Sequence, residues 1–302
     1  MLNAMPTYNR RTFQLPPFAV VLWLMIGGPF GCSTDPAPPS AAVTPYRYGT
    51  QHDSALYYYN QGWEQIMDNG QWTLSEQSFR DAVAWDSTFI IGKSLVGKNT
   101  RDLSERTALL KELKKVRHTV SADNRFLLDI TLKTLELFNA RDRGETLDST
   151  FVREFYLLGE NNYRKFIHRY PRETYMKAEY IEFLHANHGP AVALDSMRTL
   201  FTEEQQTVPF FLSYSAILES ELGNHQSALD LAERLRTLVN DPDVPEPHVL
   251  YAKVYTAMDS LILAKGYIDR ALVLDSNHII AHRVRRSIEK RTTSYPSDSA
   301  RR

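Results

Sequence analysis

One pattern occurs twice in this chain, as Phe79-Arg-Asp-Ala82-Val-Ala-Trp-Asp86-Ser87 and as Ile268-Asp-Arg-Ala271-Leu-Val-Leu-Asp275-Ser276. In each copy a large apolar residue is followed three positions later by Ala, and an Asp-Ser pair ends the stretch. A spacing of three places both apolar side chains on one helix face, while Asp and Ser favour turns. The two copies therefore predict an internal repeat that contains a helix and the turn after it.

Further turns are spaced at similar intervals. Positions equivalent to Ser87 and Ser276 recur at 121, 171, 205 and near 240, in steps of about 34, 50, 34, 35 and 36 residues. The 50-residue step predicts one enlarged helix pair, broken near 143–146, with Asp148 or Ser149 as the N-cap of its second helix. One pair cannot bury its apolar face alone, so a period of this size favours stacked pairs that share a core.

Several stretches resemble the tetratricopeptide repeat, whose period is about 34 residues. Gly223-Asn-His-Gln-Ser-Ala228-Leu229 is similar to the turn between the two helices of that repeat, and 189–194, 259–264 and Val96-Gly97 also match. Small residues are needed where two helices cross closely. The resemblance implies an all-α fold, an α-solenoid of about six degenerate tetratricopeptide-like helix pairs with a C-terminal capping helix. The pairs are expected at about 55–87, 88–121, 122–171, 172–205, 206–241 and 245–276, with a cap over 278–291 whose charged run suits a solvated face.

The N-terminal end has the parts of an export signal. Arg10 and Arg11 form a positive patch, which an apolar run over 18–26 and several small residues follow. The apolar stretch from Phe18 to Gly31 is about 14 residues long. A helix of that length is too short to span a bilayer, which needs about 20 residues.

Cys32 is the only cysteine in the chain. Gly31 before it and Ser33 after it resemble the lipobox of bacterial lipoproteins, although Pro29 and Phe30 differ from the usual Leu and small residue. The resemblance implies lipidation at Cys32 and an exported, membrane-anchored lipoprotein at the periplasmic face or cell surface of a bacterial envelope. Each buried methylene of the acyl chains adds about 0.8 kcal/mol to such anchoring. Cleavage elsewhere and an unprocessed anchor are the alternatives.

Composition divides the rest of the chain. Residues 1–32 form the predicted signal, 33–54 a tether rich in Pro, Ser and Ala, 55–291 the folded body, and 292–302 a disordered tail. The net charge of −1 provides no concentrated excess of Lys and Arg, so no nucleic acid partner is expected.

Three motifs have functional interpretations that the residues do not favour. Gly92-Lys-Ser-Leu-Val-Gly97-Lys98-Asn99 nearly matches a phosphate-binding loop, but the repeat places it inside a first helix, with Gly97 at a packing position. His278 and His282, and likewise the pair at 185 and 188, lack a neighbouring Cys or a zinc-hydrolase Glu, which favours solvent-facing or turn histidines. The run 57–59 of three tyrosines predicts helix packing with one exposed ring. We therefore expect no catalytic residue, no metal and no cofactor.

The resemblance implies a non-catalytic protein-protein interaction scaffold of the bacterial cell envelope. Its partner, another envelope protein or peptide segment, would bind in the concave groove formed by the first helices. Two alternatives remain, a surface lipoprotein that captures a ligand or glycan, and an enzyme in the enlarged middle pair. The repeat phase places these residues toward the groove: Asn60, Glu64, Lys98, Arg101, Glu182, His185, Phe210, Lys253 and Thr256.

Overall fold

The structure, a computed structural model, describes residues 45–294, and within this range the regular structure is helical, with no strand. Cys32, the predicted signal and most of the predicted tether and tail lie outside the described residues. The all-α prediction is confirmed. The helices are α1 (Asp53–Met67), α2 (Trp72–Trp85), α3 (Ile90–Asn99), α4 (Leu103–Val116), α5 (Ala122–Asp142), α6 (Ser149–Arg169), α7 (Thr174–His188), α8 (Pro190–Leu200), α9 (Pro209–Glu221), α10 (His225–Val239), α11 (Pro245–Ala257), α12 (Leu261–Leu274) and α13 (Ile279–Ser294), with short 3-10 helices η1 (Arg117–Thr119) and η2 (Gln205–Thr207).

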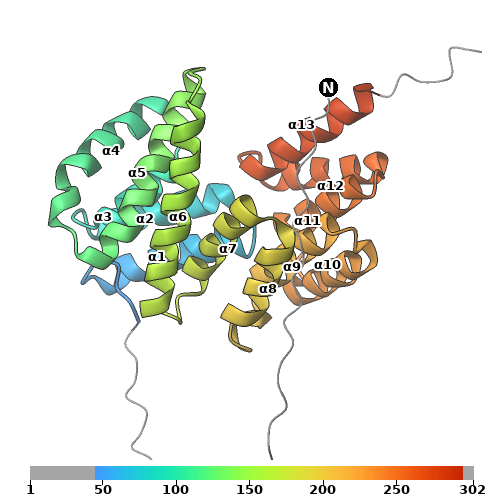
Figure 1. Cartoon of the computed structure of the whole chain (residues 1–302), viewed down its shortest axis with the longest axis horizontal. Helices are drawn as coiled ribbons and strands as arrows, with labels where there is room; N and C mark the ends of the chain where they lie inside the picture. The colour runs from blue at the N-terminus through green and yellow to red at the C-terminus, as the bar shows by residue number, and fades with distance from the viewer. Residues whose placement is uncertain (1–44, 295–302) are drawn as a thin grey trace, which may run out of the picture. The chain divides into compact units, whose positions relative to one another are not determined.

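The helices follow one another as pairs, from α1 and α2 to α11 and α12, and α13 packs against the last pair (Figure 1). First helices of neighbouring pairs also contact each other, as α3 does with α5 and α9 with α11. Each pair therefore buries its apolar face against the next pair, as in a helical solenoid.

The repeated sequence pattern has one structural meaning in both copies. Phe79 and Ala82 are buried in α2, and Ile268 and Ala271 are buried at the corresponding positions of α12. The Asp that ends each copy then accepts a hydrogen bond from the backbone N–H two residues later, with both distances 2.9 Å. This local bond competes with continuation of the helix and starts a turn.

The enlarged pair consists of α5 and α6, which have 21 residues each. Asp148 is the N-cap of α6, and its carboxylate accepts from the backbone N–H of Thr150. Gly159 lets α6 approach α7, because a Cβ at this position would lie 2.2 Å from the Phe183 ring.

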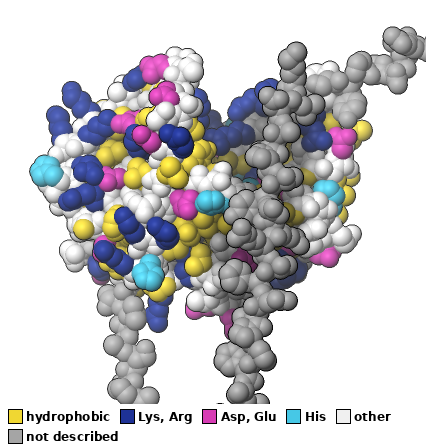
Figure 2. Space-filling model, viewed as in Figure 1, with side chains coloured by type: hydrophobic (Ala, Val, Ile, Leu, Met, Phe, Trp, Pro, Cys, Tyr) yellow, Lys and Arg dark blue, Asp and Glu magenta, His cyan; other side chains and the backbone are white. Residues whose placement is uncertain are grey.

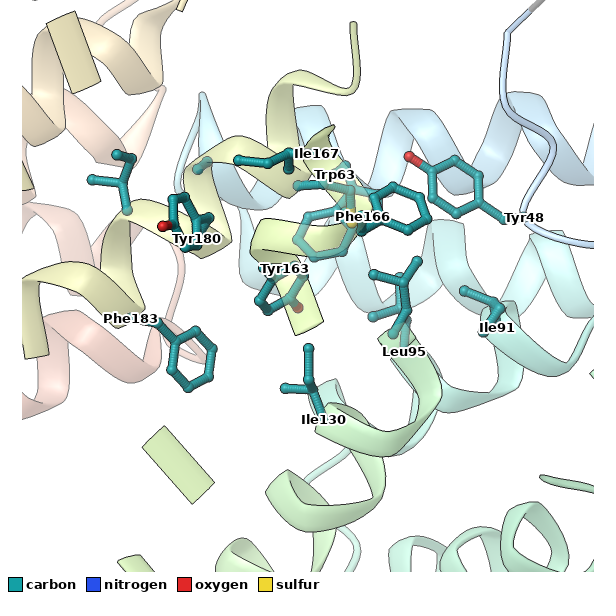
Figure 3. Close-up of a cluster of buried hydrophobic side chains, with 14 of the residues drawn as sticks. Tyr48, Trp63, Ile91, Leu95, Ile130, Tyr163, Phe166, Ile167, Tyr180 and Phe183 are labelled. Atoms are coloured by element: carbon teal, nitrogen blue, oxygen red, sulfur yellow. The ribbon is translucent and has the colours of Figure 1, made fainter. Parts of the chain in front are cut away.

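An aromatic core joins the early pairs. Trp63 of α1 lies close to Tyr163 and Phe166 of α6 in it, so the first and third pairs share this core (Figure 3). Tyr48 belongs to the same core, although the tether was predicted to extend to residue 54. The Tyr48 ring packs on the Tyr59 ring, with 4.4 Å between their centroids. Aromatic rings bury a large apolar surface, and this burial holds the segment on the core, which a purely polar tether could not do. The segment from residue 45 onward is therefore part of the folded body.

The turn between α1 and α2 contacts the later pairs directly. Asp68 accepts hydrogen bonds from the Tyr175 hydroxyl of α7 (2.7 Å) and from the Phe210 backbone N–H of α9 (2.9 Å). The Asn69 carbonyl accepts from the Glu246 N–H at the start of α11, 3.1 Å away.

The start of α2 also contacts the turn between α12 and α13. The Asp275 carboxylate accepts from the Thr73 backbone N–H (3.0 Å) and from the Thr73 hydroxyl (2.6 Å). The Asn277 amide then donates to the Thr73 hydroxyl at 3.0 Å. The winding of the stack thus brings its two ends together.

We expect Gly159→Ala to lower the free energy of unfolding by about 1–3 kcal/mol, because the added methyl group overlaps the Phe183 ring. Gly266→Ala in α12 is the matched control, since no atom lies within 4 Å of its added Cβ. The control should gain up to about 1 kcal/mol from helix propensity. Urea unfolding followed by circular dichroism measures both, and equal stabilisation of the two variants would contradict the close packing of α6 on α7.

Candidate functional site

The inner helices enclose a partly open cavity of about 240 Å³, here called the central recess. Side chains from α1, α2, α3, α5, α7, α9, α11 and α13 line it, and most of them are apolar. Its walls include Trp63, Phe79, Leu95, Phe210, Val249 and Ile279. Enclosed apolar space with a few polar groups is the usual form of a ligand pocket.

An ion pair lies in one wall of the recess. Lys98 Nζ is 2.6 Å from a Glu179 carboxylate oxygen, and the Tyr163 hydroxyl donates to the other oxygen at 3.0 Å. Lys98 also lies over the Trp63 ring, 5.4 Å from its centroid. Each charge of the pair therefore has a second favourable partner. An ion pair that is shielded from water needs such partners, because they offset the hydration that it loses.

Glu182 faces the same space one helical turn beyond Glu179. Burial among the surrounding helices raises the pKa of Glu182 to about 7, and repulsion from Glu179 acts in the same direction. Lys98 and Lys253 oppose the rise by attraction. The side chain keeps access to solvent, so it is a titratable group at the opening of the recess.

Three buried polar atoms of recess-lining residues have no hydrogen-bond partner among the described residues: Trp63 Nε1, Asn99 Oδ1 and His278 Nε2. His278 Nδ1 accepts from the Ala281 backbone N–H at 3.2 Å, which assigns the ring proton to Nε2. Asn99 Oδ1 is therefore an acceptor, and the two ring N–H groups are donors. Unpaired buried groups of this kind are costly.

His278 was predicted to face solvent or lie in a turn; it lies in the turn between α12 and α13, but it does not face solvent. It is 1% exposed, because its ring packs beside Trp72 at 5.8 Å when α13 meets the α1–α2 turn. Burial lowers the pKa of His278 to about 3, so the ring is neutral near pH 7. In the described part of the chain, no group of three His, Cys, Asp or Glu residues is arranged to hold a metal ion.

Four of the nine predicted groove residues line the central recess: Lys98, Glu182, Phe210 and Lys253. Arg101 and Lys98 line an adjoining cavity, and Thr256 and Lys253 line a third hollow beside α13. His185 instead bonds the Tyr214 hydroxyl (2.9 Å) and Glu221 (2.8 Å). Asn60 and Glu64 are exposed and line neither the recess nor the other two hollows.

Sequence reasoning did not find the other polar residues of the recess: Asn99, Glu179, Glu246, His278 and Arg283. Asn99 and Glu179 lie on first helices, so the helix phase contained a signal for them. His278 and Arg283 enter only because α13 meets the first pair, which no local pattern encodes.

The stretch that resembles a phosphate-binding loop lies within α3, as predicted. A Cβ at Gly97 would lie 3.1 Å from the Leu135 side chain of α5, so this glycine serves close helix packing. Phosphate-binding loops instead need a strand, an open loop and then a helix.

Two comparisons with known proteins found no match: no family model matches this chain, and no curated protein is similar enough to match it. None of the helices within residues 45–294 combines the length and hydropathy needed to cross a membrane.

Asp68, in the turn between α1 and α2, bonds α7 and α9, and we expect its ionisation to change the stability of the fold. Burial raises the pKa of Asp68 to about 6, against an ordinary value of 3.8. The carboxylate is thus disfavoured in the folded state, and stability falls as pH rises from about 4 through about 6.

Asp68→Asn removes that loss while keeping an acceptor for the Phe210 N–H, and the Tyr175 hydroxyl can turn to accept from the new amide. The unfolding free energy of the variant minus that of the parent should be about 1–3 kcal/mol larger at pH 8 than at pH 4. Burial of the neutral His278 ring lowers stability as pH falls from about 6.5 towards about 3, but this effect is equal in both proteins and cancels in the difference. A difference in unfolding free energy that does not change with pH would contradict the burial of this carboxylate.

Proposed function

We propose that this chain is a non-catalytic binding protein that captures a partner in the central recess, as an interaction scaffold of a bacterial cell envelope. The observation that carries the proposal is the mainly apolar central recess, whose walls also carry the charged side chains of Lys98, Glu179 and Glu182. Apolar walls favour the burial of a bound group, and a few polar side chains can fix its orientation.

Membership of the tetratricopeptide repeat family is part of this proposal. Six helix pairs with a single terminal helix support it, as do the buried small residues Ala82, Ala228 and Ala264 in second helices. A partner segment of an envelope protein is the first candidate occupant. Because Asp275 holds the last turn against Thr73, the recess suits a short segment or one inserted side chain better than a long peptide.

Capture of a small ligand is the second candidate, and the enclosure of the recess favours it. The third interpretation is an enzyme in the enlarged pair, and three buried polar side chains of α5 and α6 give it no support. Thr131, Thr134 and Asn162 are bonded to backbone carbonyls. Such bonds satisfy the side chains within the fold instead of directing them to a substrate.

A photo-crosslinking amino acid at Glu182 tests capture in the recess. Glu182 is accessible at the recess wall, whereas Ile262 is 91% exposed on α12 and serves as the matched control. In cells, we expect a discrete crosslinked species from position 182 and none from 262. Equal crosslinking from both positions, or crosslinking from 262 alone, would place the binding surface outside the recess.

Lipid anchoring at Cys32 is proposed separately, on the sequence around this residue. We expect Cys32→Ser to abolish labelling by radioactive palmitate and to change the membrane association of the protein. Ser33→Ala is the control and should keep the label. Unchanged labelling of the Cys32 variant would contradict the proposal and leave the function of the recess unaffected.

A further inference from the structure

A second cavity adjoins the central recess and carries most of the local positive charge. This basic cleft, of about 590 Å³, lies between α13 and the C-terminal ends of α3 and α5. Lys and Arg side chains gather near the hollow between the early helices and α13 (Figure 2). One carboxylate, that of Asp142, is among the lining residues, against six cations: Lys98, Arg101, Arg106, Arg141, Arg283 and Arg286.

Within the cleft, three of these cations have carboxylate partners. Arg106 and Arg141 both pair with Asp142, and Lys98 pairs with Glu179. Each of these positive charges is therefore at least partly compensated by the protein itself.

The other three cations lack an ion pair. Arg101 donates to the Asn277 carbonyl, while Arg283 and Arg286 make no hydrogen bond or ion pair within residues 45–294. Partial burial lowers the pKa of Arg283, repulsion from Arg141 and Arg286 acts in the same direction, and attraction to Glu182 opposes the shift. Like charges that converge in a cleft attract an anion more strongly than the same charges spread over a surface.

Arg283, Arg285 and Arg286 are all exposed, as expected for the solvated face of the cap. Arg285 pairs with Glu289 at 3.0 Å along its own helix. Arg283 and Arg286 lie on the side of α13 that lines the basic cleft. The helix thus divides its charge between an internally paired face and an unpaired face.

The two cavities adjoin each other. Lys98, Phe138, Ile279 and Arg283 line both of them, so the mainly apolar recess lies next to the cationic cleft. Two recess carboxyls are partly compensated, because Lys98 pairs with Glu179 and burial raises the pKa of Glu246. The exposed Glu182 also lies at the recess wall, where Lys98, Lys253 and Arg283 attract it.

We infer that the central recess and the basic cleft together bind an amphipathic anion. Its apolar chain or ring lies in the recess, and its carboxylate, sulfate or phosphate group lies among Arg101, Arg283 and Arg286. This inference rests on the proposed function of the recess as a binding site and names the class of small ligand that it takes.

Isothermal titration calorimetry of the full chain with octanoate, octanol and acetate tests the inference. Octanoate has both required parts, octanol lacks the charge, and acetate lacks the apolar chain. We expect saturable binding of octanoate, weaker binding of octanol and no saturable binding of acetate at the same concentrations. Added salt should weaken the octanoate interaction and leave the octanol interaction almost unchanged.

The double variant Arg283→Ala/Arg286→Ala should weaken octanoate binding about tenfold or more, because charge-assisted hydrogen bonds to the anion are lost. Arg285→Ala, on the paired face of the same helix, should leave the affinity unchanged. Thermal unfolding of each variant verifies that it is folded.

Three outcomes overturn the inference: absence of octanoate binding, octanol binding as tight as that of octanoate, or an unchanged octanoate affinity in the double variant. None of them tests capture of a protein segment, which crosslinking from position 182 measures independently. The proposed function can therefore stand when the anion inference fails. Loss of position-specific crosslinking would reject protein capture without deciding the calorimetric result.

Discussion

The contact between the α1–α2 turn and the later helix pairs determines the shape of the inner face of this stack. Asp68 bonds α7 and α9, the Asn69 carbonyl bonds α11, and Thr73 bonds Asp275 before α13. A helical solenoid whose repeats touch only their neighbours has an open concave face. Here, hydrogen bonds between residues about 200 positions apart enclose that face and convert it into a recess.

The fold could be predicted because its information is local and repeated. Phe79 and Ala82, like Ile268 and Ala271, occupy buried positions, and the Asp that follows each copy closes a turn. Helix phase also places side chains, which is why Lys98, Glu182, Phe210 and Lys253 line the recess. An error of one position would rotate a side chain by about 100° and move it off this face.

The enclosure of the site could not be predicted, because it depends on the accumulated winding of all the pairs. His278 is a turn residue by local pattern, and it is buried only because its turn meets the first pair. Arg283 and Arg286 likewise belong to a charged helix whose exposed face cannot be told from sequence alone. Glu64 and Asn60 lie outside the cavities because α1 turns another face, that of Trp63, Ile66 and Met67, toward the recess.

Pulsed electron paramagnetic resonance between spin labels on α2 and α13 tests the enclosure directly. The labels would be attached at Leu74→Cys and Glu289→Cys, both exposed positions, with Cys32 replaced by Ser. We predict one narrow distance distribution in this background, and a broader distribution at longer distances when Asp275→Ala removes the bonds to Thr73. A broad distribution in the presence of Asp275, or one that the substitution leaves unchanged, would contradict a recess held closed by the two ends of the stack.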